Sequence, residues 1–206
     1  MRRALRRSPT CVASAIASAR ELSAAPLVCA ALNFAAALVM AFVLAPATPV
    51  VADAGLRARY VETHVVPWQL GWSIWTAAAL SLLWFYAWWR DRVRASYVPV
   101  VIALLGFVAD ATAEFALIVY LVTDPPFAFT LTGVVANGLY TICGIWLTLV
   151  TRLTTTERIW AGLMWSAGVA LSVATFFGAY LTAAIATVVL FVLFCPWCVY
   201  LAVKLR

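Results

Sequence analysis

Charged residues are scarce in this sequence. Only 11% of its 206 residues are charged, whereas about a quarter are charged in a soluble globular domain. Acidic residues number 8 against 14 lysines and arginines, and 66% of all residues are hydrophobic. This composition excludes an ordinary soluble domain and favours a protein that resides in a lipid bilayer.

Histidine and lysine occur once each, and several catalytic motifs are missing. His64 alone cannot supply both axial ligands of a bis-histidine haem, so a b-type cytochrome is not supported. Lys204 lies at the carboxyl terminus, where it cannot form a Schiff base with retinal inside a bundle. The GxSxG, Walker A and HExxH patterns of hydrolases, nucleotide-binding proteins and zinc proteases are absent. The sequence therefore does not indicate a particular cofactor.

Six long segments contain almost no charged residues, and each approaches or exceeds the roughly 20 residues that cross about 30 Å of hydrocarbon. They predict an all-α membrane protein whose residues 26–206 form one bundle of six transmembrane helices. The first helix is predicted to begin at Pro26, because proline is favoured at the first position of a helix. The predicted spans are 26–44, 67–89, 97–122, 127–151, 159–177 and 180–203.

The positive charges are distributed unevenly around these spans. Only Arg57 and Arg59 lie in the loop 45–66. All others flank the opposite ends of the spans: Arg2, Arg3, Arg6, Arg7, Arg20, Arg90, Arg92, Arg94, Arg152, Arg158, Lys204 and Arg206. Because basic loops are retained in the cytoplasm, both termini are predicted to be cytoplasmic. A bacterial inner membrane is the favoured location, and an organellar membrane stays open.

The net charge of +6 is explained by this orientation and by contact with membrane lipids, and it does not indicate a nucleic-acid partner. Residues 1–25, with one acidic residue, Glu21, are predicted to form a basic cytoplasmic arm that leads into an interfacial helix. A transit peptide has a similar composition. In the loop 45–66, the i, i+3 spacing of Arg59 and Glu62 predicts a short helix on the membrane surface.

Tight outer turns are predicted at two places. Thr123-Asp124-Pro125-Pro126 connects the third and fourth spans. Between the last two spans the only break is Gly178-Ala179, which requires a very short turn. A single kinked or re-entrant element is the alternative for the second place.

Two carboxylic acids, Asp110 and Glu114, lie near the middle of the third span, with Asp110 about 18 Å from either end. Their spacing of four residues places both on one helix face. A carboxylate at the bilayer centre costs about 2.5–3.5 kcal/mol, and two close carboxyl groups disfavour the ionisation of both. The pair is therefore expected to hold one proton, which suits proton movement, cation binding or general acid chemistry.

Polar residues of other spans are predicted to surround the acid pair. The short loop between the third and fourth spans brings Asn137 and Tyr140 to a similar depth. Further candidates for a shared cavity are Asn33, Gln69, Trp72 and Ser73. The tryptophans of the second span can stack on a small cationic or hydrophobic ligand, or they belong to an ordinary aromatic belt.

The alternative is a purely structural role for these groups. Single polar residues often join transmembrane helices by hydrogen bonds. Both acids would then be satisfied by neighbours, for which the candidates are Asn137, Tyr140, Ser73, Thr76 and Arg59. In the fourth span a stripe of small and polar residues is predicted to pack closely against another helix: Gly133, Asn137, Tyr140, Thr141, Gly144 and Thr148.

The sequence Cys195-Pro-Trp-Cys198 lies near the end of the last span. It is similar to the Cys-x-x-Cys motif of thioredoxin-like and membrane oxidoreductase families, which implies redox or metal chemistry at these thiols. The βαβ context of the thioredoxin-like families is missing here, and so is the second cysteine pair of the membrane oxidoreductases. Cys11 and Cys29 lie on the same predicted side, so a thiol metal site is a further alternative. Buried cysteines otherwise serve as small hydrophobic residues.

Three function classes follow from these features. The first is a protein that binds or moves protons, cations or a small ligand at the carboxylate site, as in a permease or channel subunit. The second is an intramembrane enzyme in which Asp110 and Glu114 protonate and deprotonate a lipid or isoprenoid. The third is a non-catalytic subunit or assembly factor, with another membrane protein or a second copy as partner.

Overall fold

The computed structural model describes the backbone of residues 9–119 and 126–205, and the side chains of 24–119 and 127–205. Every regular element in these ranges is helical, and six segments are long and apolar enough to cross a membrane. The all-α, six-span prediction is confirmed to that extent. The elements are α1 (Pro9–Val39), η1 (Met40–Leu44), η2 (Ala45–Ala47), α2 (Ala54–Thr63), α3 (Val65–Val93), α4 (Val98–Val119), α5 (Pro126–Thr130), η3 (Leu131–Ala136), α6 (Asn137–Val150), α7 (Thr155–Phe176) and α8 (Tyr180–Lys204).

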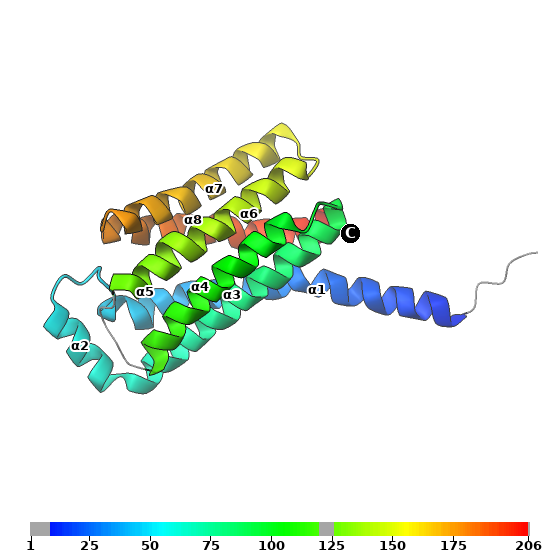
Figure 1. Ribbon diagram of the computed structural model, residues 1–206. Helices are drawn as coiled ribbons and strands as arrows, with labels where there is room; N and C mark the ends of the chain where they lie inside the picture. The colour runs from blue at the N-terminus through cyan, green and yellow to red at the C-terminus, as the bar shows by residue number, and fades with distance from the viewer. Residues whose placement is uncertain (1–8, 120–125, 206) are drawn as a thin grey trace, which may run out of the picture.

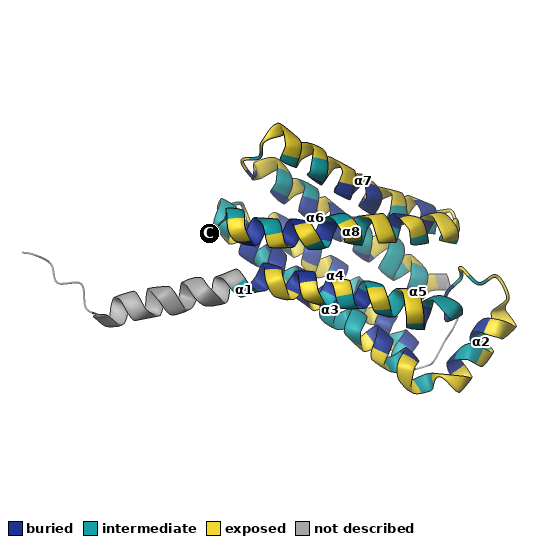
Figure 2. Ribbon diagram, turned by 180° about the vertical axis from the view of Figure 1, so that it is seen from behind, coloured by how far each residue is buried: buried dark blue, intermediate teal, exposed yellow. Residues whose placement is uncertain are grey.

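The long helices form a closed ring. In chain order α1, α3, α4, α6, α7 and α8 each lie beside the next, and α8 lies beside α1 (Figure 1). Consecutive helices run in opposite directions. Exposed residues lie on the outward faces of the helices (Figure 2), and many are large and apolar, such as Phe42 and Leu149. A helix that is apolar on its outward face is stable when that face meets lipid.

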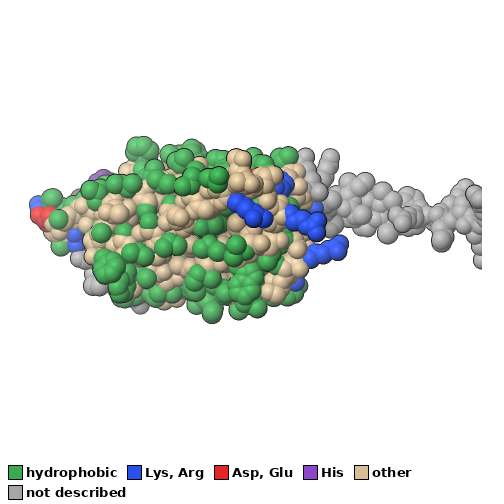
Figure 3. All heavy atoms as spheres, turned by 90° about the horizontal axis from the view of Figure 1, so that it is seen from above, with side chains coloured by type: hydrophobic (Ala, Val, Ile, Leu, Met, Phe, Trp, Pro, Cys, Tyr) green, Lys and Arg blue, Asp and Glu red, His purple; other side chains and the backbone are tan. Residues whose placement is uncertain are grey.

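The two ends of the ring differ in charge. We call the end with Arg90, Arg92, Arg94, Arg152, Arg158 and Lys204 the basic end, and the opposite end, which carries α2, the α2 end. Lys and Arg side chains gather at the basic end, from which α1 projects (Figures 1 and 3). For the described residues, the predicted segregation of positive charge is confirmed.

Helix α1 begins earlier than predicted. It runs from Pro9 to Val39 with Pro26 in its interior, so the expected helix start at Pro26 is wrong. Proline removes one backbone hydrogen bond from a helix interior, but the alanine and leucine residues around it are strong helix formers. The first eight residues of the predicted arm, and the side chains of Cys11 and Arg20, lie outside the described part. The interfacial location of the arm stays a prediction.

The predicted helix in the loop 45–66 is present as α2. Asp53 caps it by accepting a hydrogen bond from the N–H of Leu56 at 3.0 Å. Tyr60 donates its hydroxyl hydrogen bond to the carbonyl oxygen of Val43 at 2.8 Å and so ties α2 to η1. The other predicted outer turn, at residues 123–126, falls largely outside the described residues.

A three-residue turn separates α7 from α8, so the prediction of two helices is confirmed. Gly178 has φ of +70°. The N–H of Gly178 bonds to the carbonyl oxygen of Thr175 at 3.1 Å, and the N–H of Ala179 bonds to that of Ala174 at 2.8 Å. These two bonds are those of a Schellman motif, which places a left-handed residue directly after the helix.

Replacing Gly178 by alanine is expected to lower the free energy of unfolding by about 1 kcal/mol, because alanine is strained at this positive φ. Gly162→Ala is the matched control, since a Cβ at Gly162 meets nothing within 4 Å. Thermal unfolding of the purified variants in detergent measures both. A Gly178→Ala protein as stable as Gly162→Ala would contradict the prediction.

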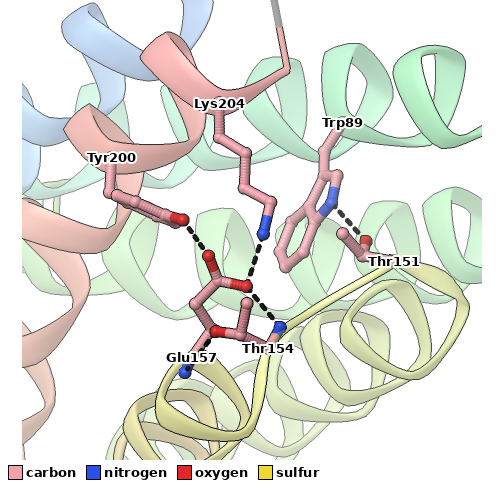
Figure 4. Close-up of polar contacts among 6 residues, drawn as sticks. All are labelled: Trp89, Thr151, Thr154, Glu157, Tyr200 and Lys204. Atoms are coloured by element: carbon pink, nitrogen blue, oxygen red, sulfur yellow. Dashed lines mark hydrogen bonds and ion pairs between the residues drawn. The ribbon is translucent and has the colours of Figure 1, made fainter.

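Polar contacts hold α7 against α8 at the basic end (Figure 4). The carboxylate of Glu157 accepts hydrogen bonds from the hydroxyl of Tyr200 and from the ammonium of Lys204, both on α8. Glu157 also forms a capping box with Thr154, whose backbone N–H donates to Glu157 at 2.6 Å. One carboxylate thus fixes both the start of α7 and the end of α8.

The small and polar residues of α6 pack against α7, as predicted. Asn137 donates its side-chain N–H to the carbonyl oxygen of Gly168 at 2.8 Å. Trp165 donates its indole N–H to the hydroxyl of Thr148 at 2.9 Å. A Cβ at Gly144 would lie 2.2 Å from the Trp165 ring, which shows how closely the two helices approach.

Candidate functional site

A cavity of about 300 Å³ lies inside the ring, in the half nearer the α2 end. All six long helical segments contribute to its lining. Towards the basic end it is closed by Tyr86, Trp165 and Phe194, which belong to the main buried core. Tyr86 is held at this closed end of the cavity because its hydroxyl donates a hydrogen bond to the carbonyl oxygen of Tyr140 at 2.9 Å.

Asp110 is on the wall of this cavity and is only 3% exposed. Its Oδ1 accepts a hydrogen bond from the hydroxyl of Thr132, and its Oδ2 accepts one from the hydroxyl of Tyr140 at 3.4 Å. The predicted proximity of Asp110 and Tyr140 is therefore present. The long Tyr140 bond leaves Oδ2 less fully satisfied than Oδ1, because 3.4 Å exceeds the usual distance between hydroxyl and carboxylate oxygens.

Thr132 was not among the predicted site residues, and a π-helical turn explains why. Thr132 lies in η3, which inserts one additional residue into the span that continues as α6. In an uninterrupted α-helix Thr132 and Tyr140 would differ by about 80° around the axis, whereas the insertion reduces this to about 20°. The π turn thus brings both hydroxyl groups to the same carboxylate. A pattern search with a period of 3.6 residues cannot find this pair.

Glu114 shares the helix face of Asp110 but turns towards α3. It is 1% exposed, and its Oε2 accepts a hydrogen bond from the hydroxyl of Thr76. Its Oε1 is buried without a hydrogen-bond partner among the described residues. Glu114 is not part of the cavity lining. The predicted acid pair is therefore split between the cavity wall and the α3–α4 interface.

Two tryptophans of α3 form an aromatic wall of the cavity. Trp72 is 1% exposed, and its indole N–H has no hydrogen-bond partner among the described residues. Trp75 packs edge-to-face on Phe191 of α8, with ring centroids 5.8 Å apart. Aromatic side chains thus line the same space as the Asp110 carboxylate.

Asn33 and Asn137 line the cavity, but both amides also hold helices together. Asn33 donates to the carbonyl oxygen of Cys29 in its own helix at 2.9 Å and to the hydroxyl of Ser81 in α3 at 3.5 Å. The side-chain nitrogen of Asn137 bonds to α7, with Ser172 at 2.8 Å as its second acceptor. The structure places neither amide in a hydrogen bond to the acids.

Three other predicted partners lie away from the cavity. Gln69 donates to the carbonyl oxygen of Ile118 at 3.1 Å and joins α3 to α4. Ser73 is exposed and donates to its own helix, to the carbonyl oxygen of Gln69 at 2.8 Å. One residue corresponds to about 100° around a helix, so Ser73 leaves the face that Trp72 shares with Thr76. Arg59 is exposed and donates to the carbonyl oxygen of its own helix residue Gly55.

The four cysteines whose side chains the structure describes carry free thiols. Cys198 is buried in the main core, and Cys195 is half buried at a shallow groove between α1 and α8. Within the described residues no group of three or more histidine, cysteine, aspartate and glutamate side chains is arranged to hold a metal ion. The redox interpretation of Cys195 and Cys198 stays a prediction.

The charge of the cavity determines which ligands it can hold. Among the described lining residues Asp110 is the only acidic or basic one, and the others are apolar or neutral polar. Such a wall favours a cation or a hydrogen-bond donor and disfavours an anion. Comparisons with protein families, with curated proteins and with solved structures found no match.

Proposed function

We propose that this protein binds a small organic cation with an apolar body in the cavity, with Asp110 as its counterion. The observation that carries the proposal is that Asp110 is the single acidic or basic group among the described residues of an otherwise neutral wall. A buried carboxylate is costly in hydrocarbon unless a charge or hydrogen bonds compensate it. A bound cation supplies the compensation that Thr132 and Tyr140 supply only in part.

The aromatic lining supports the same ligand class. Ring faces within about 6 Å of a cation attract it, most strongly in a desolvated site. Trp72, Trp75 and Phe191 lie on the wall, and Phe129 and Tyr140 add further rings. A volume of about 300 Å³ is at the lower end of the range for small-molecule sites. We therefore expect a ligand with one charged nitrogen and one ring or short chain inside the cavity.

The position of Glu114 favours binding over two-carboxylate catalysis. An enzyme that protonates and deprotonates one substrate needs both acids within hydrogen-bond reach of it. Glu114 is not in the lining and instead accepts its hydrogen bond from Thr76. The single carboxylate at the cavity supports a binding or transport role more directly than an isomerase role.

Glu114→Gln is expected to change cation affinity by no more than about threefold. Glutamine keeps an oxygen that accepts the hydrogen bond of Thr76, and position 114 is outside the lining. Titration of the Glu114→Gln protein with benzyltrimethylammonium checks this prediction. A loss of affinity as large as that of Asp110→Asn would instead assign both acids to the ligand site.

We also propose that the basic end faces the cytoplasm of a bacterial cell, with both termini on that side. The concentration of Arg and Lys at one end of the six apolar segments supports this orientation. This orientation places α2, and the half of the ring that holds the cavity, towards the external side. Membrane lipids are the expected neighbours of the exposed apolar surface.

The test compares two probes that differ in charge alone. Benzyltrimethylammonium and neopentylbenzene have nearly the same shape, but only the first carries a positive nitrogen. We expect the purified protein in detergent to bind the cation about tenfold more tightly or better, measured by tryptophan fluorescence and calorimetry. Equal affinity for the two probes, or no binding of the cation, would contradict the proposed function.

A further inference from the structure

The cavity has a mouth on the side of the ring. Of the described residues that line it, three are exposed, namely Ala41 in η1, Val50 after η2, and Val188 in α8. The lining residues of α3, α4, α6 and α7 are buried or half buried. The cavity therefore reaches the surface where η1 and the chain after it face α8.

The backbone leaves this side open because α1 and α8 separate towards the α2 end. Over the described residues, α8 lies beside α1 and α7 but not beside η1 or η2. The chain of α1 leaves regular α-helical geometry at Met40, where the π-helical η1 begins. The seam between α1 and α8 is therefore closed near the basic end and open beside η1.

Two of the three exposed residues at the mouth, Ala41 and Val188, lie at a depth that hydrocarbon occupies in a membrane, whereas Val50 lies three residues past the end of its apolar segment. Ala41 is six residues from the end of its apolar segment, which ends at Ala47, and Val188 is eight residues into α8. At 1.5 Å per residue these positions are about 9 and 12 Å inside the span. Asp110 is nine residues, or about 14 Å, from Val119, the last described residue of α4 on the same side. The carboxylate is thus at a depth similar to that of the part of the mouth between Ala41 and Val188.

The surface around the mouth is apolar as well. Phe42 is 78% exposed, and Leu181 is 68% exposed. Exposed apolar side chains next to an apolar opening provide no barrier to an alkyl chain, whereas a polar solute gains nothing there. The surroundings of the mouth fit a membrane-dissolved molecule.

We infer that the ligand is a cationic amphiphile that enters sideways from the lipid, between η1 and α8. This inference rests on the proposed cation site at Asp110. Its headgroup nitrogen lies against Asp110, and its alkyl chain passes through the mouth lined by Ala41 and Val188 into the surrounding lipid. The cavity alone, at about 300 Å³, then holds the headgroup while the chain stays outside.

The test uses benzyldimethyldodecylammonium and the full-length protein in lipid nanodiscs. Ala41→Phe and Ala184→Phe add a ring on opposite sides of the mouth, and both positions line the cavity. Ile185→Phe is the matched control, because Ile185 is exposed on α8 and is not in the lining. Association and dissociation are followed by stopped-flow tryptophan fluorescence.

We expect both mouth variants to slow association and dissociation by about tenfold with the dissociation constant nearly unchanged, since a barrier on the route affects both directions equally. Ile185→Phe should behave like wild type. Unchanged rates in Ala41→Phe and Ala184→Phe, with binding that still depends on Asp110, would overturn the lateral route and leave the cation site standing. An absence of Asp110-dependent binding in wild type would overturn the site itself, and the route with it.

Discussion

Asp110→Asn is expected to weaken the binding of benzyltrimethylammonium about 100-fold while the protein stays folded. The variant removes the only negative charge from the described cavity wall. Loss of one partner from a desolvated charge pair costs about 2–5 kcal/mol, and 100-fold corresponds to about 2.7 kcal/mol. Asparagine has nearly the volume of aspartate, and its carbonyl oxygen can still accept the hydrogen bond of Thr132.

Two controls separate the charge from the shape of the site. Neopentylbenzene, the neutral probe, should bind wild type and Asp110→Asn with affinities within about twofold of each other. Thermal unfolding should show that Asp110→Asn is at least as stable as wild type, because it no longer buries an ionisable group. If Asp110→Asn keeps its affinity for the cation, Asp110 is not the counterion.

Gly144→Val is expected to have the largest effect on stability, a loss of about 3 kcal/mol or failure to accumulate as folded protein. A Cβ at Gly144 would lie 2.2 Å from the indole ring of Trp165, well inside contact distance. The ring cannot easily move, since its N–H is bonded to Thr148 and the ring is 6.3 Å from that of Phe194. Overpacking of a close helix interface costs about 1–3 kcal/mol or more.

Gly162→Val is the control for the valine itself. Gly162 is in α7 and is exposed, and a Cβ there meets nothing within 4 Å. Folded yield and thermal unfolding in detergent should place this variant close to wild type. A Gly144→Val protein with the stability of Gly162→Val would show that α6 and α7 do not pack as closely as described.

Much of the fold follows from the sequence because the bilayer imposes a simple rule. A span must satisfy its own backbone and expose apolar side chains, so length and hydropathy suffice to find it. The α6 stripe was also predictable, since Gly144 and Asn137 are small or polar at helical spacing and pack on α7. The start of α1 could not be predicted, because Pro26 is tolerated inside this helix, where the surrounding residues favour helical structure.

The candidate site was only partly predictable. Asp110 and Glu114 could be identified from the sequence because carboxylates are costly in the middle of an apolar span. Asp110 lies at the cavity with Tyr140, as expected. Sequence spacing gave no sign that Glu114 would turn to Thr76, because two residues on one broad helix face can still meet different neighbours. The contact of Thr132 with Asp110 depends on a π turn, which has no reliable sequence signature.

The measurement that tests the central claim most directly is photolabelling with a diazirine derivative of benzyltrimethylammonium, followed by peptide mapping. We expect adducts on lining residues around Asp110, such as Phe129 and Phe191, and their loss in Asp110→Asn. Adducts confined to exposed residues outside the lining, such as Phe115 and Leu149, and equal in wild type and Asp110→Asn, would contradict a cation site in the cavity.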